Sequence, residues 1–416
     1  YNTLLTAGED DGTNTDTPTG YFDDVELTRS SPVAKLTGQV YLGTFDWKIP
    51  EDPTVGGTLF YSPTEKNYPY LTGHFREYSS AVGSSTLKCD PSTSGATCAW
   101  DLAQNIPAWG SRRAYVAGLS GSTYSLATAA SLAADATVSF IAANIGTKLG
   151  AIDYSTGAVI EGKGDSSLVT IASAKTRPTV AYVGARDGFL HAVCADTTCY
   201  GYSPGTELWA ILPIGVKAQI TAARTAKDFR NVNIGGAIRV GDFQDTFLGQ
   251  AASYRTVLIG GTRESGHVFA MDISNPNPTN LNQDGLRYLW EQDGTVGVSG
   301  TEKMGPTLGA TIAAKGTTGY AIVTSARQAG LAPGINTYVL RMTDGMVLAF
   351  NQKLYSRNIK LASGALAPIP TLAPALATVV DADENGDDET VFVSDYEGAV
   401  RKLRLNTDGT IASSLV

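Results

Sequence analysis

The sequence predicts an all-β fold of the β-propeller class, from its composition and from a hairpin phrase that recurs along the chain. The 416 residues include 45 glycines and 19 tyrosines, whereas only 17% are charged, a balance typical of strand-rich secreted proteins. The phrase is a short apolar strand, a turn with Asp or Glu before Gly, and a second apolar strand. Because one hairpin cannot cover its own apolar face, the repeats predict sheets packed around an axis.

Four copies of this hairpin can be recognised. Their turn glycines are spaced unequally and more widely than in a minimal four-stranded blade, which predicts an irregular propeller with inserted loops. Residues 151–163 form another pair of strands that suits the same architecture. A β-sandwich is the alternative. The copies begin at Thr179, Thr256, Thr337 and Thr390, and their turns contain Gly188, Gly266, Gly345 and Gly398.

The remaining segments predict a few short helices and one polar end. Residues 126–134 are rich in alanine and 139–144 have mixed apolar character, so we expect one or two short helices there. Residues 1–20 are rich in Asp, Thr and Gly, which indicates a flexible or extended segment. We therefore expect residues 21–416 to form a single propeller domain.

The charge of the chain limits its partners. Its net charge is −9 and it has no basic run, so the sequence indicates neither a nucleic-acid partner nor an anionic lipid surface. No apolar stretch is long enough to span a bilayer. The chain starts at Tyr1 without a leader, and we expect it to be a mature fragment.

The four cysteines form two close pairs in polar, turn-rich segments. Two local disulfides are the simplest interpretation, and they imply an oxidising compartment outside the cytoplasm. Zinc is the alternative, but neither pair is CxxC, and each histidine stands alone. The expected disulfides join Cys89 to Cys98 and Cys194 to Cys199, and the histidines are His74, His191 and His267.

An acidic loop at residues 381–389 predicts a calcium site. Oxygen-bearing side chains alternate around Gly386, which permits a sharp turn, and calcium prefers about six to eight oxygen ligands. The spacing follows the start of an EF-hand loop, but Phe392 replaces its final carboxylate and strands flank it. A solvated acidic turn is the alternative. The expected ligands are the side chains of Asp381, Asp383, Asn385 and Glu389 and the carbonyl of Asp387.

A set of separated segments, in a fixed order along the chain, resembles a known family. Their sequences include Leu-Thr-Gly-His-Phe-Arg, Val-Gly-Ala-Arg-Asp-Gly-Phe-Leu-His-Ala and Glu-Leu-Trp-Ala-Ile-Leu-Pro. With the acidic loop, they resemble the C-terminal propeller domain of the PilY family, the type IV pilus-associated tip proteins of bacteria. The resemblance runs from about residue 35 to the end. The segments are 71–76, 99–107, 111–115, 183–192, 207–213 and 254–261.

This resemblance implies a modified seven-bladed propeller, exported through the periplasm to the pilus tip or outer cell surface. It implies partners among the minor pilins and the pilus tip, and adhesion to a host or abiotic surface. Calcium in the acidic loop would control pilus extension and retraction, and thereby twitching motility. The family pattern is Asp-x-Asp/Asn-x-Asp/Asn-x-x-x-Asp, which the four side-chain ligands follow, with Asp387 as the carbonyl donor.

The sequence departs from the family in three places. Glu389 stands where the family often has Asp, which lengthens the reach by one methylene. The von Willebrand-type N-terminal region of many members is not in this sequence, so its adhesive roles are not carried over. The Arg-Gly-Asp tripeptide of some members is also missing, because residues 186–188 read Arg-Asp-Gly.

An enzyme is the alternative function. Residues 151–157 read Ala-x-Asp-x-x-Thr-Gly, which is similar to the repeats of dehydrogenases that use pyrroloquinoline quinone, but no tryptophan follows Gly157 as in those repeats. No hydrolase, haem or phosphate-binding motif is found, and hairpin packing accounts for each histidine. We therefore expect no catalytic residues. The tryptophans do not recur at a blade period in the sequence; they are Trp47, Trp100, Trp109, Trp209 and Trp290.

Overall fold

The structure is a computed structural model of the 416-residue chain, and parts of the chain are described in it. The described residues are 40–46, 61–62, 65–66, 72–78, 98–145, 149–150, 152, 155–161, 177–226, 229, 232–245, 253–283, 285–295, 302–315, 318–360, 366–368, 372–382 and 390–412. The segment 1–20, expected to be flexible or extended, lies outside these residues.

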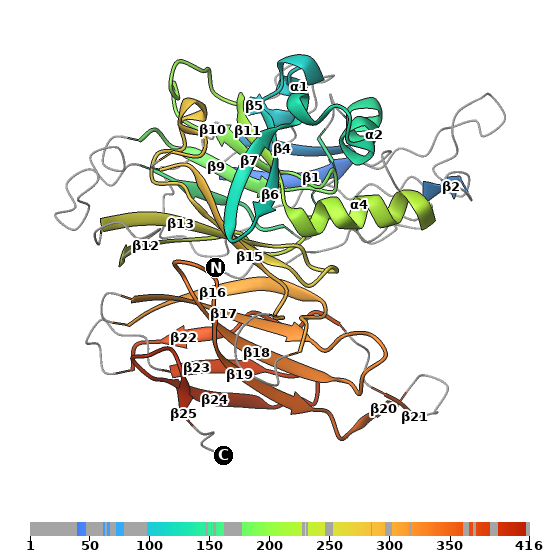
Figure 1. Cartoon of the computed structure of the whole chain (residues 1–416), viewed down its shortest axis with the longest axis vertical. Coiled ribbons are helices and arrows are strands. Elements are labelled where there is room, and N and C mark those ends of the chain that lie inside the picture. Colours follow the sequence, from blue (N-terminus) through green and yellow to red (C-terminus); the bar gives the residue numbers. More distant parts are fainter. Residues whose placement is uncertain are drawn as a thin grey trace, which may run out of the picture.

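The described strands form five sheets of three or more strands, which succeed one another along the chain. In Figure 1 the first two sheets lie at the top, the third below them, and the fourth and fifth at the bottom. The third, fourth and fifth sheets are four-stranded antiparallel meanders whose strands pair in sequence order, as in a propeller blade. This confirms the predicted all-β, propeller-type architecture. The blade number of seven stays a prediction.

The three meanders have these strands. The third sheet contains β12 (Arg239–Asp245), β13 (Ser253–Gly261), β14 (Val268–Asp272) and β15 (Arg287–Gln292). The fourth contains β16 (Thr307–Lys315), β17 (Thr318–Ala326), β18 (Gly334–Arg341) and β19 (Val347–Leu354). The fifth contains β22 (Thr378–Val380), β23 (Thr390–Ser394), β24 (Val400–Leu405) and β25 (Ile411–Ala412).

The first two sheets are less regular. The first contains β1 (Val40–Asp46), β4 (Thr72–Tyr78) and β5 (Cys98–Asp101). In the second sheet a hairpin of β6 (Ala114–Ser120) and β7 (Thr123–Thr128) joins the outer edge of a meander, because β6 pairs with β11 in parallel. That meander contains β8 (Ala158–Ile160), β9 (Val180–Gly184), β10 (Leu190–Cys194) and β11 (Glu207–Leu212).

The shorter elements lie between these sheets in the sequence. Two small hairpins pair β2 (Tyr61–Ser62) with β3 (Glu65–Lys66), and β20 (Asn358–Lys360) with β21 (Leu366–Pro368). The described α-helices are α1 (Leu102–Asn105), α2 (Ala136–Ile145) and α4 (Ile214–Ala226).

The helix predictions were partly correct. The helix expected at 139–144 lies within α2, whereas 126–134 contains the end of β7 and a short 3-10 helix, Ala129–Leu132. Helix α4 was not expected from the sequence. No helix among the described residues is long and apolar enough to cross a membrane.

The predicted turn glycines all adopt left-handed backbone conformations. Their φ angles are +88° at Gly188, +67° at Gly266, +72° at Gly345 and +84° at Gly398. Residues with a Cβ rarely adopt such angles, so these positions favour glycine. The four hairpins predicted from the sequence are therefore confirmed.

The core is divided among the interfaces between successive sheets. Phe75 and Trp100 pack between the first and second sheets, and their ring centroids lie 5.8 Å apart. Trp209 belongs to the cluster between the second and third sheets, and Trp290 to the cluster between the third and fourth. Tyr320 packs between the fourth and fifth. Each sheet thus buries apolar side chains against its neighbours in the series.

Three buried aromatic residues also hydrogen-bond across these interfaces. The indole N–H of Trp209 donates to the carbonyl of Pro276 at 3.0 Å, and that of Trp290 donates to Met342 at 2.7 Å. The hydroxyl of Tyr320 donates to the carbonyl of Thr407 at 2.7 Å. Trp209 and Trp290 occupy equivalent places in their sheets, because each pairs with the central alanine of the preceding strand.

The β6–β7 hairpin is held against the third sheet by polar contacts. The amide group of Asn282 accepts from the N–H of Leu126 at 2.8 Å and donates to its carbonyl at 2.7 Å. The hydroxyl of Tyr124 donates to the carbonyl of Glu291 at 2.8 Å. Asn282 therefore satisfies backbone groups at the edge of β7 that would otherwise be open to another strand.

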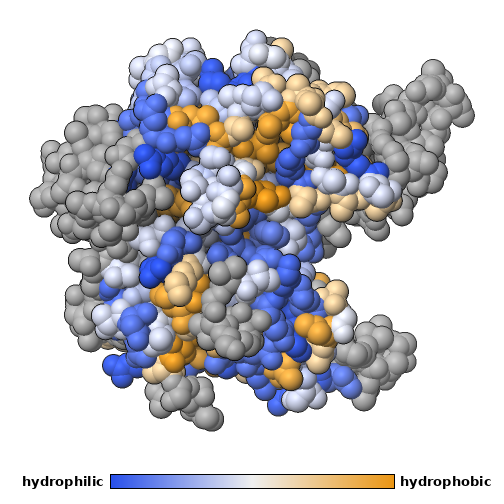
Figure 2. All heavy atoms as spheres, viewed as in Figure 1, coloured by the Kyte–Doolittle hydropathy of each residue, from blue (hydrophilic) through white to orange (hydrophobic). Residues whose placement is uncertain are grey.

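The molecular surface mixes polar and apolar residues. The face in Figure 2 carries blue hydrophilic residues with orange apolar patches between them. Large apolar side chains are exposed at several separate strand ends, and Val400, at 70% exposure, is the most open of those described. Scattered exposure of this kind is normal for a folded domain.

Candidate functional site

The predicted calcium loop joins β22 to β23 in the last sheet. Val380 at the end of β22 pairs with Thr390 at the start of β23, so the sheet holds the two ends of this connection together. The flanking elements are strands, as the sequence indicated. Asp381 follows β22 directly and is half-buried.

The other predicted ligands are not placed by the structure. Asp383, Asn385, Asp387 and Glu389 lie outside the described residues. Within the described part of the chain, no three His, Cys, Asp or Glu side chains are grouped so that they could hold a metal ion. The calcium site therefore stays a prediction.

One of the two predicted disulfides is confirmed. Cys194, at the end of β10, is bonded to Cys199, with 5.5 Å between the Cα atoms, and both residues are fully buried. This pair is therefore not a zinc ligand pair. Cys98 begins β5, whereas Cys89 lies outside the described residues, so the second bond stays a prediction.

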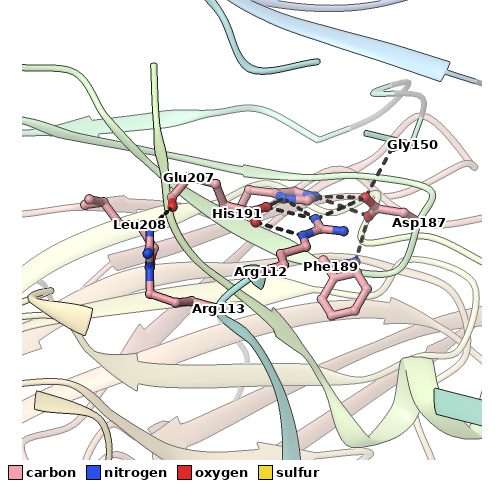
Figure 3. Close-up of polar contacts among 8 residues, drawn as sticks. All are labelled: Arg112, Arg113, Gly150, Asp187, Phe189, His191, Glu207 and Leu208. Atoms are coloured by element: carbon pink, nitrogen blue, oxygen red, sulfur yellow. Dashed lines mark hydrogen bonds and ion pairs between the residues drawn. The ribbon is translucent and has the colours of Figure 1, made fainter. Parts of the chain in front are cut away.

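The structure brings together four charged residues that the sequence analysis did not connect. Arg112, Asp187, His191 and Glu207 meet inside the second sheet, with fully buried side chains (Figure 3). Arg112 lies just before β6, Asp187 lies in the β9–β10 turn, His191 lies on β10 and Glu207 begins β11. The network therefore links the attached hairpin to the meander.

The hydrogen bonds in this network are short, and nearly all of its polar side-chain atoms have a partner. Arg112 donates from Nε to Glu207 Oε2 at 2.7 Å and from Nη2 to Oε1 at 2.8 Å. His191 contacts Glu207 Oε1 through Nδ1 at 2.7 Å, and Asp187 through Nε2 at 3.1 Å. Two carboxylates thus face one guanidinium and one imidazole, which balances the charge when His191 is protonated.

The surrounding backbone supports Asp187. Its carboxylate accepts from the N–H of Phe189 at 2.9 Å and from that of Gly150 at 3.2 Å. A Cβ on Gly150 would lie 2.1 Å from the backbone nitrogen of Asp187, so this close approach needs glycine. The guanidinium of Arg112 lies over the ring of Phe189, with Cζ 5.1 Å from its centroid.

The charges of the network shift the pKa values of Asp187, His191 and Glu207. Burial favours neutral groups, but the charges of Asp187 and Glu207 outweigh it at His191 and raise its pKa to about 9. Burial is likewise outweighed by Arg112 and His191, which lower the pKa of Glu207 to about 2. The pKa of Asp187 is also lowered against burial, mainly by His191. All four groups are therefore charged at neutral pH.

This network lies in the interior and its charges pair with one another. Its side chains have no exposed surface, and two carboxylates face one guanidinium and one imidazole inside the cluster. The expectation that His191 serves the packing of its hairpin is consistent with this position. One signal in the sequence could have indicated the network, because His191 and Glu207 interrupt strands that are otherwise apolar.

A second buried carboxylate joins the third sheet to α4. Glu291 on β15 accepts from the N–H groups of Ile214 at 2.9 Å and Gly215 at 2.7 Å, at the helix N-terminus. It also accepts from the hydroxyl of Tyr288 at 2.6 Å and lies 3.1 Å from Nδ1 of His267. A carboxylate is favourable at this end of a helix, because it satisfies free N–H groups and complements the helix dipole.

The described sheets thus define a protein of the β-propeller class, with its charged clusters in the interior. No family model matches the chain. A stretch of 122 residues, 29% of this chain, is 30% identical to a protein of Xylella fastidiosa described as a type IV pilus biogenesis factor PilY1 homolog. The match spans 8% of that relative's length.

A comparison with solved structures finds a quinohemoprotein alcohol dehydrogenase from Pseudomonas putida HK5. The match covers 81% of this chain and 55% of the dehydrogenase, at 8% sequence identity and a TM-score of 0.29. A likeness at this level supports no statement about function.

Proposed function

We propose that this chain is the propeller-type domain of a type IV pilus-associated surface protein and acts as a binding module. The observation that carries the proposal is the 30% identity over 122 residues to a relative described as a PilY1 homolog. The buried Cys194–Cys199 disulfide supports it, because such bonds persist in proteins exported to oxidising compartments. The partners would be the minor pilins and the pilus tip, and the host or abiotic surface that a pilus meets.

The proposal includes a calcium ion in the loop after β22. The pairing of Val380 with Thr390 supports it, because it fixes the ends of a connection that carries several carboxylates. Calcium would offset the repulsion among these groups, and its removal would loosen the loop and any partner surface built on it. In the pilus, this change would regulate extension and retraction.

Calcium binding can be tested by titration calorimetry and by terbium luminescence on the full chain. We expect one site in the wild type and a large loss of affinity in Asp381→Asn. Asp408→Asn is the matched control, because Asp408 lies in the turn between β24 and β25 and bonds only locally, to Thr410. Equal binding by Asp381→Asn and the wild type would remove the assigned site.

Pilus association can be tested with isolated type IV pili and purified minor pilins. We expect the chain to bind one of them with calcium present, and more weakly after chelation with EGTA. If it binds neither pili nor pilins in either condition, the pilus proposal is wrong. Reconstitution with pyrroloquinoline quinone tests the enzyme alternative, and dye reduction with turnover would contradict a purely binding role.

A further inference from the structure

Three buried polar groups from different segments face the interface between the second and third sheets. Arg177 precedes β9 and is 5% exposed, and Tyr182 on β9 is completely buried. Tyr200 directly follows Cys199 in the connection between β10 and β11, and its hydroxyl is buried. Each of the three residues has a polar atom without a hydrogen-bond partner in the described structure, namely Arg177 Nη2, Tyr182 Oη and Tyr200 Oη.

The guanidinium of Arg177 is held in place on its other sides. Nε donates to the carbonyl of Glu161 at 3.1 Å, and Nη1 donates to Oγ1 of Thr256 on β13 at 2.6 Å. The nearest carboxylate in this chain of contacts is Asp242, which accepts from Thr256 Oγ1 at 2.7 Å. Among the described residues, no carboxylate forms an ion pair with Arg177 itself.

The two tyrosines are suited to act as donors beside this cation. Burial raises the pKa of both phenols, and the charge of Arg177, which acts on both, lowers it by less. Both hydroxyls therefore remain protonated at neutral pH. The ring of Tyr182 is fixed against Trp209, with 5.7 Å between the centroids.

A buried cation without a counter-charge is costly, and so is a buried donor without an acceptor. Arg177 offers a fixed positive charge and an N–H group without a partner, and both hydroxyls lie near enough for its charge to act on them. Water would satisfy the donors but would bring no negative charge, and Asp242 reaches Arg177 only through the hydroxyl of Thr256.

We propose that Arg177, Tyr182 and Tyr200 bind a compact monovalent anion, a halide or a short carboxylate, between the second and third sheets. The anion would accept from Arg177 Nη2 and from both hydroxyls. It would also tie the β10–β11 connection, through Tyr200, to the interface between the sheets. This inference is independent of the proposed pilus function and of the calcium loop.

Thermal unfolding of the full chain at constant ionic strength tests the site. We expect the midpoint to rise by about 2–4 °C in chloride, bromide or acetate relative to gluconate, which is too large to be enclosed. Chloride and bromide acting more strongly than acetate would identify a halide, and the reverse order a carboxylate. Equal midpoints in all four salts would overturn the proposal.

Conservative variants separate binding from folding. Tyr182→Phe and Tyr200→Phe each remove one donor while keeping the ring, and we expect both to lose most of the salt-specific shift. Tyr202→Phe is the control in the same β10–β11 connection. Its ring lies under Arg113, with 4.2 Å from Cζ to the centroid, and the shift should be retained. Equal shifts in all three variants would contradict the assignment.

Crystals grown or soaked in bromide give a direct readout. We expect an anomalous peak within hydrogen-bond distance of Arg177 Nη2, which disappears in Arg177→Met. If acetate is the stronger stabiliser, the planar density of a carboxylate is expected there instead. Density for water alone at this position, in crystals exposed to both anions, would refute the site.

Discussion

Arg112 and Glu207 form a two-pronged ion pair in the interior of the second sheet, with N–O distances of 2.7 and 2.8 Å and no exposed side-chain surface. The two residues are separated by 95 positions, and Arg112 leads into β6 whereas Glu207 opens β11. The pair therefore fixes the parallel contact by which the β6–β7 hairpin joins the meander.

Removal of one member of this pair should strongly destabilise the protein. Arg112→Met leaves Glu207 and Asp187 buried with only His191 between them, and we expect a loss of about 3–5 kcal/mol in the free energy of unfolding. Urea denaturation followed by circular dichroism measures it. Arg341→Met is the control, because the Arg341–Asp344 pair is about half exposed and should cost about 0–1 kcal/mol. Similar losses in both variants would show that the buried pair has no special role.

The same network predicts how stability depends on pH. The pKa of His191 is raised from 6.5 to about 9, so its contribution is complete below pH 6.5 and is lost as pH rises through 9. The pKa of Glu207 is lowered from 4.5 to about 2, so its contribution is complete above pH 4.5 and is lost as pH falls through 2. We expect the contribution of the network to be greatest between pH 4.5 and 6.5.

Unfolding free energies measured between pH 6.5 and 9 in the wild type and in His191→Gln test the dependence on His191. The variant should lack the part of the alkaline loss that comes from His191, because glutamine does not titrate. If both proteins lose stability in parallel between pH 6.5 and 9, His191 is not the group responsible.

A matched pair of turn glycines separates backbone strain from crowding. Gly188 and Gly398 have φ angles of +88° and +84°, but a Cβ on Gly188 would lie 2.9 Å from Val216, whereas Gly398 faces open space. We expect Gly398→Ala to cost about 1 kcal/mol from the left-handed conformation alone. Gly188→Ala should cost clearly more, as measured by chemical denaturation. A smaller cost at Gly188 than at Gly398 would contradict the close packing of α4 on this turn.

The Cys194–Cys199 bond should contribute modestly, because it closes a short loop. From the loop-closure entropy of a segment of this size, we expect Cys194→Ser/Cys199→Ser to cost about 2 kcal/mol. Urea denaturation of the double variant measures this loss without reduction of the other cysteine pair. An unchanged midpoint would mean that the surrounding hydrogen bonds hold the loop without the bond.

The local features of this protein could be predicted from its sequence. The turn phrases around Gly188, Gly266, Gly345 and Gly398 specify their hairpins, since the left-handed turn and the flanking strands involve neighbouring residues. The five-residue separation of Cys194 and Cys199 likewise limits their geometry enough for a bond to be expected. The acidic spacing from Asp381 to Glu389 predicts a calcium loop on the same local grounds, and that prediction remains to be tested.

The sequence did not predict features that depend on contacts between distant segments. Helix α4 contains many helix-forming residues, but its N-terminal amides are satisfied by Glu291, which follows 76 positions after Gly215. The equivalent placement of Trp209 and Trp290 in their sheets became apparent only from their strand pairing.

By itself, the sequence determined where the strands reverse direction and where two cysteines can meet, because backbone sterics and short loops decide both. Only the tertiary structure decided that β6 runs parallel to β11 and that Arg112, Asp187, His191 and Glu207 share one interior site. The reason is physical: a buried charge is tolerated only where its partners surround it, and those partners come from segments whose proximity local sequence does not specify.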